Sequence, residues 1–253
     1  MGCLAYAGLV LWHLGYPEQA LQRMHEALTL AAEVSHPFSL AQVQHFAWLL
    51  HKFRREWHLA QERNEAQMAL ATEQGFLEMV AQAAKNRAEL ALCTQGQGED
   101  IIAMLHRSLA ALRATGRPPR PTDLAILAEA YRQVGQTEAG LRLLAEALTV
   151  ADTTGGQHAE AELHQLRGEF LLALAADHDA EAETCFQQAL AVARRQQAKS
   201  LELRAAMSLA RLWQRQGKRA VAREMLAPLY GWFTEGFDTA DLQDARALLD
   251  ELA

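Results

Sequence analysis

Ten histidines and one short acidic turn are the residues of this 253-residue chain whose types could do chemistry. Histidine and carboxylate side chains bind divalent metals when several face one point, commonly at i, i+4 on a helix. The densest histidines, His45, His51 and His58, are spaced by six and seven residues, with a turn expected at Arg54–Arg55. Neither spacing puts two ligands on one helix face, so we expect no metal site.

The acidic turn holds Asp177, His178 and Asp179. A solvated connection explains it, because acidic groups stabilise the N-terminus of the helix that follows. The chain has no G-x4-GK[ST], HExxH, GxSxG or paired CxxC motif, and the glycines of QGQGED do not follow a strand. We therefore expect no catalytic residue, no metal and no cofactor, and we predict that the chain is not an enzyme.

Four aromatics lie within eight residues of the segment Tyr230–Leu242, YGWFTEGFDTADL, although aromatics make up only 7% of the chain. One interpretation is a binding site. The other is a hydrophobic seal in which Asp238 caps a last helix, and Phe237 and Leu242 form a hydrophobic staple. The amphipathic pattern after Asp238 favours the seal.

The amino-acid composition predicts which type of secondary structure must position any functional site. Apolar residues make up 50% of the chain, mostly Ala and Leu, and no stretch alternates as a strand would, which predicts an all-α fold. The net charge of −7 argues against binding nucleic acid, and no apolar run is long enough to span a membrane. We expect a soluble, cytoplasmic protein whose three cysteines are small buried hydrophobes.

A repeat with a period near 40 residues organises the chain. Three second helices carry the pattern A-x3-bulky-x2-A-L, in which Gly replaces the first Ala once, and three weaker copies lie between and after them. Each second helix follows a first helix with a central "waist" residue. The waists are separated by 40, 41, 39, 40 and 42 residues, and they are Gly8, Trp48, Glu89, Ala128, Gly168 and Ala210. Repeated units of this kind bury their apolar faces against their neighbours.

This pattern predicts a right-handed α-solenoid of about six helix pairs. It resembles the tetratricopeptide (TPR) signature, and HEAT-type repeats are the alternative. We expect three repeats in 1–116, a proline-rich loop in 117–123, three repeats in 124–238 and a C-terminal capping helix in 239–253. The proline-rich loop is either an extended connection or a hinge.

The concave face of such a solenoid is the usual binding surface, lined by first-helix residues one turn from each waist. Trp12 and Trp48 are either core residues that fill gaps between repeats or part of an apolar groove. A protein or peptide partner fits this surface, and a small-molecule inducer is the alternative. The candidate binding residues are Leu9, Trp12, His45, Leu49, Lys52, Asn86, Leu90, Glu129, Arg132, Glu169 and Arg211.

Several stretches resemble one family, above all EAELHQLRGEFLLAL (160–174) and the segment 200–252. They are similar to the C-terminal TPR region of bacterial multidomain regulators that carry a class III adenylate/guanylate cyclase domain and then an AAA-type, STAND-like ATPase. The resemblance implies a non-catalytic regulatory arm whose partners include the upstream domains of the same polypeptide. The chain is then a fragment of a longer protein or a stand-alone descendant, and the fragment is favoured.

Overall fold

The computed structural model describes residues 1–95, 99–118, 120–174 and 176–253. Part of the expected QGQGED turn and Pro119 of the proline-rich segment lie outside these residues. The described part is all-helical and contains no strand. None of its helices is both long and apolar enough to cross a membrane.

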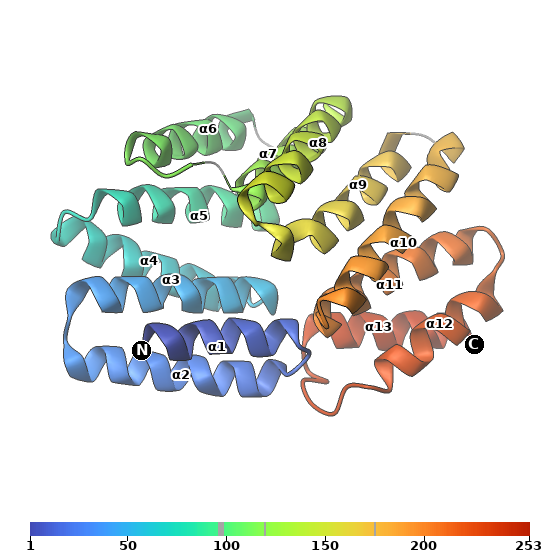
Figure 1. Cartoon of the computed structure of the whole chain (residues 1–253), viewed down its shortest axis with the longest axis horizontal. Helices are drawn as coiled ribbons and strands as arrows, with labels where there is room; N and C mark the ends of the chain where they lie inside the picture. The colour runs from blue at the N-terminus through green and yellow to red at the C-terminus, as the bar shows by residue number, and fades with distance from the viewer. Residues whose placement is uncertain (96–98, 119, 175) are drawn as a thin grey trace. The chain divides into compact units, whose positions relative to one another are not determined.

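The chain divides into two compact units, which we describe separately. The first comprises Met1–Trp12 with Pro17–Pro119, and the second comprises His13–Tyr16 with Arg120–Ala253. The first six helices, drawn from blue to green in Figure 1, are α1 Gly2–His13, α2 Pro17–Val34, α3 Pro37–Phe53, α4 Trp57–Glu73, α5 Leu77–Gln95 and α6 Glu99–Ala114. Within the first unit, α2 packs on α3, α3 on α4, α4 on α5 and α5 on α6.

The second unit repeats this succession. Its α-helices are α7 Pro121–Gln133, α8 Thr137–Thr154, α9 Glu160–Leu174, α10 Asp179–Arg195, α11 Lys199–Arg215, α12 Arg219–Tyr230 and α13 Ala240–Glu251. Short 3-10 turns at Gln157–Ala159 and Ala176–His178 precede α9 and α10. Each helix packs on the next one, and α9 also contacts both α7 and α11.

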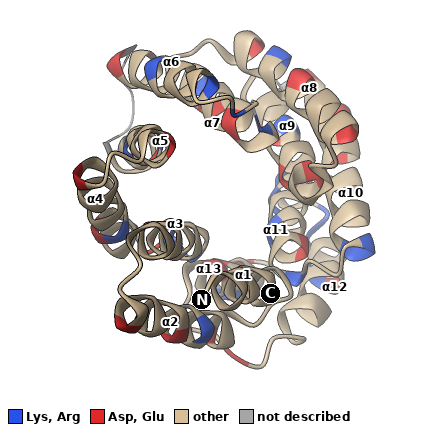
Figure 2. Cartoon of the chain, turned by 60° about the vertical axis from the view of Figure 1, so that its left-hand side comes forward, with Lys and Arg blue, Asp and Glu red and all other residues tan. Residues whose placement is uncertain are grey.

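The six waist residues all lie on odd-numbered helices, and all are buried. We call α1, α3, α5, α7, α9 and α11 the first helices and α2, α4, α6, α8, α10 and α12 the second helices. Figure 2 shows both acidic and basic residues on second helices such as α2 and α4. Charge of both signs is therefore present on these helices.

Small residues allow close approach within a helix pair, as the repeat predicts. A Cβ added at Gly8 would lie 3.0 Å from the carbonyl oxygen of Ala20, at the start of α2. A Cβ at Gly140 would lie 2.9 Å from the carbonyl oxygen of Ala128. One at Gly168 would lie 2.5 Å from the Phe186 ring. In these three pairs, small residues therefore bring the helices to distances that a larger side chain would prevent.

The C-terminal helix α13 packs on α11 and α12, as expected of a cap. The prediction for how it starts is wrong, because Thr239 rather than Asp238 occupies the N-cap position with extended backbone. Phe237 is 49% exposed, whereas Phe233 and Leu242 are buried. The seal is thus made by Phe233, and Phe237 lies at the surface against Tyr230, with ring centroids 6.0 Å apart.

The expectation for the cysteines is also wrong in part. Cys185 on α10 is buried, but Cys3 on α1 and Cys93 on α5 are exposed. Cys93 lies near the end of α5, and Cys3 lies in the first turn of α1. A cysteine in a helical pattern does not by itself reveal which face it occupies.

Candidate functional site

Two lysines and one glutamate form the central cluster of the first unit. The Lys52 ammonium of α3 makes an ion pair with Glu89 of α5, and the Lys85 Nζ lies 3.5 Å from the other Glu89 carboxylate oxygen. The side chains of Lys85 and Glu89 are only 7% and 5% exposed. Both ammonium groups also lie over the indole of Trp48, 5.7 and 5.5 Å from its centroid. The cluster is therefore held by charge and by cation–π attraction.

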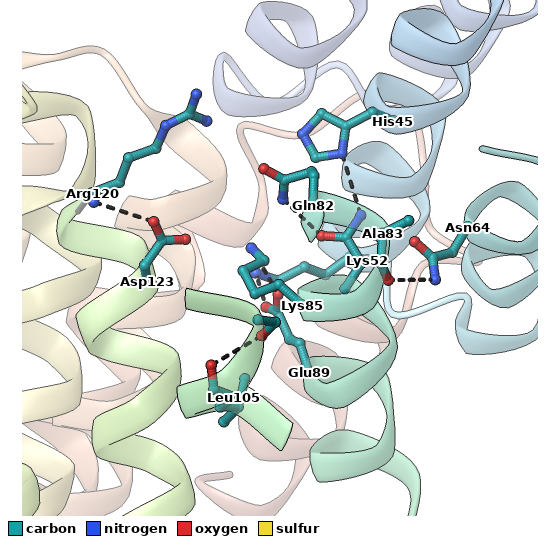
Figure 3. A network of polar contacts seen from close by, with 12 residues as sticks. His45, Lys52, Asn64, Gln82, Ala83, Lys85, Glu89, Leu105, Arg120 and Asp123 are labelled. Carbon is teal, nitrogen blue, oxygen red and sulfur yellow. Dashed lines mark hydrogen bonds and ion pairs between the residues drawn. The ribbon is translucent and has the colours of Figure 1, made fainter. Parts of the chain in front are cut away.

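Hydrogen bonds between side chains extend this cluster along α5 (Figure 3). His45 stacks on Trp48 with ring planes 12° apart, and its Nδ1 lies 3.3 Å from Asn86 Nδ2. Gln82 donates to the Asn86 carbonyl oxygen at 3.0 Å and accepts from Arg117. Because Asn86 Nδ2 donates to Nδ1, a neutral His45 carries its proton on Nε2. The network fixes the tautomer and the ring orientation of His45.

Three of the apolar residues considered for the binding surface, Leu9, Trp12 and Trp48, are buried and cannot contact a partner. Trp12 is 3% exposed and stacks on Phe53 with centroids 4.6 Å apart, while Leu9 is 8% exposed. Trp48 is 1% exposed, which confirms the core interpretation of both tryptophans. Leu49 and Leu90 are half-buried and remain within reach of a partner.

Glu129, Arg132 and Glu169, three of the candidates in the second unit, belong to another set of polar contacts, on α7, α9 and α11. Arg132 donates through Nε to Glu129 at 2.8 Å, and its guanidinium lies 5.6 Å from the Phe170 centroid. Its hydrogen bonds to Glu129 raise the pKa of Arg132 and outweigh the effect of burial. Ser208 of α11 donates to Glu169 at 3.0 Å. Arg211 is exposed on the same helix.

These contacts join residues separated by about one repeat. Lys52 and Glu89 are 37 residues apart, and His45 and Asn86 are 41 apart. In the second unit, Gln165 donates to Ser208, 43 residues away, at 3.2 Å. His45 and Asn86 occupy equivalent positions, three residues before their waists, and the other pairs are offset by one to four residues. Consecutive first helices thus contact each other through side chains within each unit.

Gln82, Lys85 and Ser208 were missed as members of these networks. Glu89 was recognised only as a waist, although a carboxylate at a position that usually holds Gly or Ala is itself a signal of a buried charge with partners. The partners of Glu89 depend on how α3 packs against α5, and this packing cannot be predicted from a local sequence pattern.

The densest histidines are not brought together. His51 Nδ1 lies 2.6 Å from Glu56, and His58 lies on the surface, 3.4 Å from Glu62. Burial raises the pKa of Glu56, but hydrogen bonds from His51 and Arg54 outweigh it and hold this pKa below its usual value. Within the described ranges, no three His, Cys, Asp or Glu side chains are grouped so that they could hold a metal ion.

A titratable histidine, His13, is the last residue of α1 and belongs to the second unit. Burial, with the positive charges of His158 and Arg204, lowers the pKa of His13 from 6.5 to about 4. The unfolded chain therefore binds one more proton than the folded chain between these pH values. The stability that neutral His13 provides is complete above pH 6.5 and is lost as the pH falls towards 4.

We expect the free energy of unfolding to fall by up to about 1.4 kcal/mol for each pH unit in this range through His13 alone. His13→Gln should reduce the slope between pH 6.5 and 4, as measured by urea unfolding at several pH values. His25→Gln, an exposed change on α2, is the control. Equal slopes for His13→Gln and the wild type would contradict this assignment.

The described part defines an all-α protein of consecutively packed helices. No protein-family profile matches the sequence, and no curated protein is significantly similar to it.

Proposed function

We propose that the chain is a non-catalytic protein-interaction or regulatory module, built of about six TPR-like helix pairs with a C-terminal capping helix. Its partner binds the exposed parts of the first helices. The resemblance to cyclase–ATPase regulators supports one partner above others, which is the ATPase region of the same polypeptide. In that arrangement the module senses a signal and biases the ATPase.

The observation that carries this proposal is the pair of side-chain networks on the first helices. Residues about one repeat apart hold each other in place, so the polar groups near them are fixed before any partner arrives. A surface ordered in advance loses little conformational entropy on binding. The partly or fully exposed candidates around these networks are His45, Leu49, Lys52, Leu90, Glu129, Arg132, Glu169 and Arg211.

The surface is mixed in charge, which favours a partner with polar and apolar contacts over one that is only charged. Lys52 and Arg132 each share their charge with a glutamate. A small-molecule or peptide inducer has less support, because Trp12 and Trp48 are buried and supply no aromatic wall. A thermal-shift screen with nucleotides, sugars and peptides tests that alternative.

Isothermal titration calorimetry tests the proposal, with the purified chain and a P-loop ATPase region of the kind proposed as its partner. Arg211→Glu should weaken binding about tenfold, because it reverses an exposed charge on the first-helix surface. Arg223→Glu makes the same change on the second helix α12 and should change the affinity less than twofold. Equal loss in both variants, or no binding by the wild type, would contradict the proposal.

A further inference from the structure

The first helix of the chain has an exposed face that is entirely apolar. Cys3, Tyr6 and Val10 share this face, and Tyr6 and Val10 are 62% and 40% exposed. Apart from His13 at its end, α1 contains only apolar residues, Gly and Tyr. A helix that is apolar on all sides is ordinarily covered on all sides. We call these three residues the α1 outer face.

The other first helices show what covers this face. Cys3, Tyr6 and Val10 lie five before, two before and two after the waist Gly8. Residues five before and two after the waist are 1% exposed or less in three other first helices, where they are Val43 and Leu50 in α3, Leu163 and Phe170 in α9, and Ala205 and Leu212 in α11. The preceding second helix packs on each of these first helices, α2 on α3, α8 on α9 and α10 on α11.

The contact between α8 and α9 shows which kinds of side chain meet in this packing. Phe170, the residue two after the waist of α9, approaches Gly140 so closely that a Cβ there would lie 2.5 Å from its ring. Gly140 is the small residue at the first position of the small-x3-bulky-x2-A pattern in α8. In α1 the residue equivalent to Phe170 is Val10. By analogy with Gly140 of α8, we expect a helix that covers Val10 to present a small residue at this point.

We propose that the α1 outer face binds a further amphipathic helix of the second-helix type, with a small residue opposite Val10 and the small-x3-bulky-x2-A pattern. The repetition within the chain identifies this occupant, because such a helix packs on α3, α9 and α11. This surface is separate from the first-helix surface proposed above to bind the partner. Failure of one proposal therefore leaves the other standing.

A peptide of Pro17–Val34 tests this proposal, because α2 is itself a second helix that packs on the following first helix. Residues 22 and 26 are joined by a lactam after Gln22→Lys, which keeps the peptide helical, so that helix formation does not limit affinity. The labelled peptide is titrated with the full chain and followed by fluorescence anisotropy. We expect saturable binding, and a peptide with Ala20→Leu should bind at least tenfold more weakly.

Variants of the full chain complete the test. Tyr6→Glu and Val10→Glu should each weaken peptide binding at least tenfold, because they bury a charge in the contact. Leu77→Glu, on an exposed apolar residue of α5, should leave binding unchanged. All three positions are exposed, and circular dichroism melting checks that the variants fold.

Two results would overturn the proposal. One is the absence of saturable binding, or equal binding by all variants. The other is a wild-type chain that is dimeric in analytical ultracentrifugation and becomes monomeric with Tyr6→Glu, which would identify a second copy as the occupant.

Discussion

Glu89→Ala is expected to lower the free energy of unfolding by about 3–5 kcal/mol, because it leaves two lysines beside an apolar indole without their shared carboxylate. The lost side chain is 5% exposed, so water cannot readily replace it. Equilibrium urea unfolding measures the change. Glu62→Ala, which removes an exposed partner of His58, is the matched control and should cost less than about 1 kcal/mol.

A combined variant separates the charge from the shape of the cluster. Glu89→Leu with Lys52→Met and Lys85→Met removes all three charges and keeps most of the volume. We expect it to recover most of the stability lost in Glu89→Ala, because a whole buried ion group can be replaced by apolar residues at little cost. If Glu89→Ala were no more harmful than Glu62→Ala, the cluster would not hold α3 to α5.

Gly168→Ala is expected to destabilise the second unit by about 3 kcal/mol, although alanine is the better helix former. The new Cβ would lie 2.5, 2.8 and 2.9 Å from three atoms of the Phe186 ring, which is fully buried. Gly231→Ala is the control, because its nearest atom is the Ala227 carbonyl oxygen at 3.4 Å. Thermal and urea unfolding give the two free-energy changes.

A double-mutant cycle with Phe186→Leu isolates this contact. The smaller side chain should cost less in the Gly168→Ala background than in the wild type, with a coupling energy above about 1 kcal/mol. Additive changes would show that the glycine is needed for another reason, such as backbone conformation.

The sequence predicted the helix pairs better than the contacts between them. Gly8, Gly140 and Gly168 could be interpreted correctly because a small residue opposite a larger one is a local pattern that repeats every 40 residues or so. For Trp12 and Trp48 the sequence left open a core position and an apolar groove, and the structure buries both. The α-helical class needed only composition and the absence of strand-like alternation.

What could not be predicted depends on tertiary packing. The pairing of Glu89 with two lysines requires the register of α3 against α5, and the Glu169–Ser208 contact requires that of α9 against α11. Exposure of Cys3 depends on what covers α1, which its own pattern does not show. The start of α13 at Ala240 differs by one residue from the expected start, because Asp238 and Thr239 are both good N-caps.

The proposed function is tested most directly by amide hydrogen exchange on the complex between the chain and the ATPase region proposed as its partner. Binding should slow exchange in the first helices α3, α5, α7, α9 and α11 and leave the outer turns of the second helices unchanged. Protection confined to the second helices, or no protection in any helix, would contradict a binding surface on the first helices.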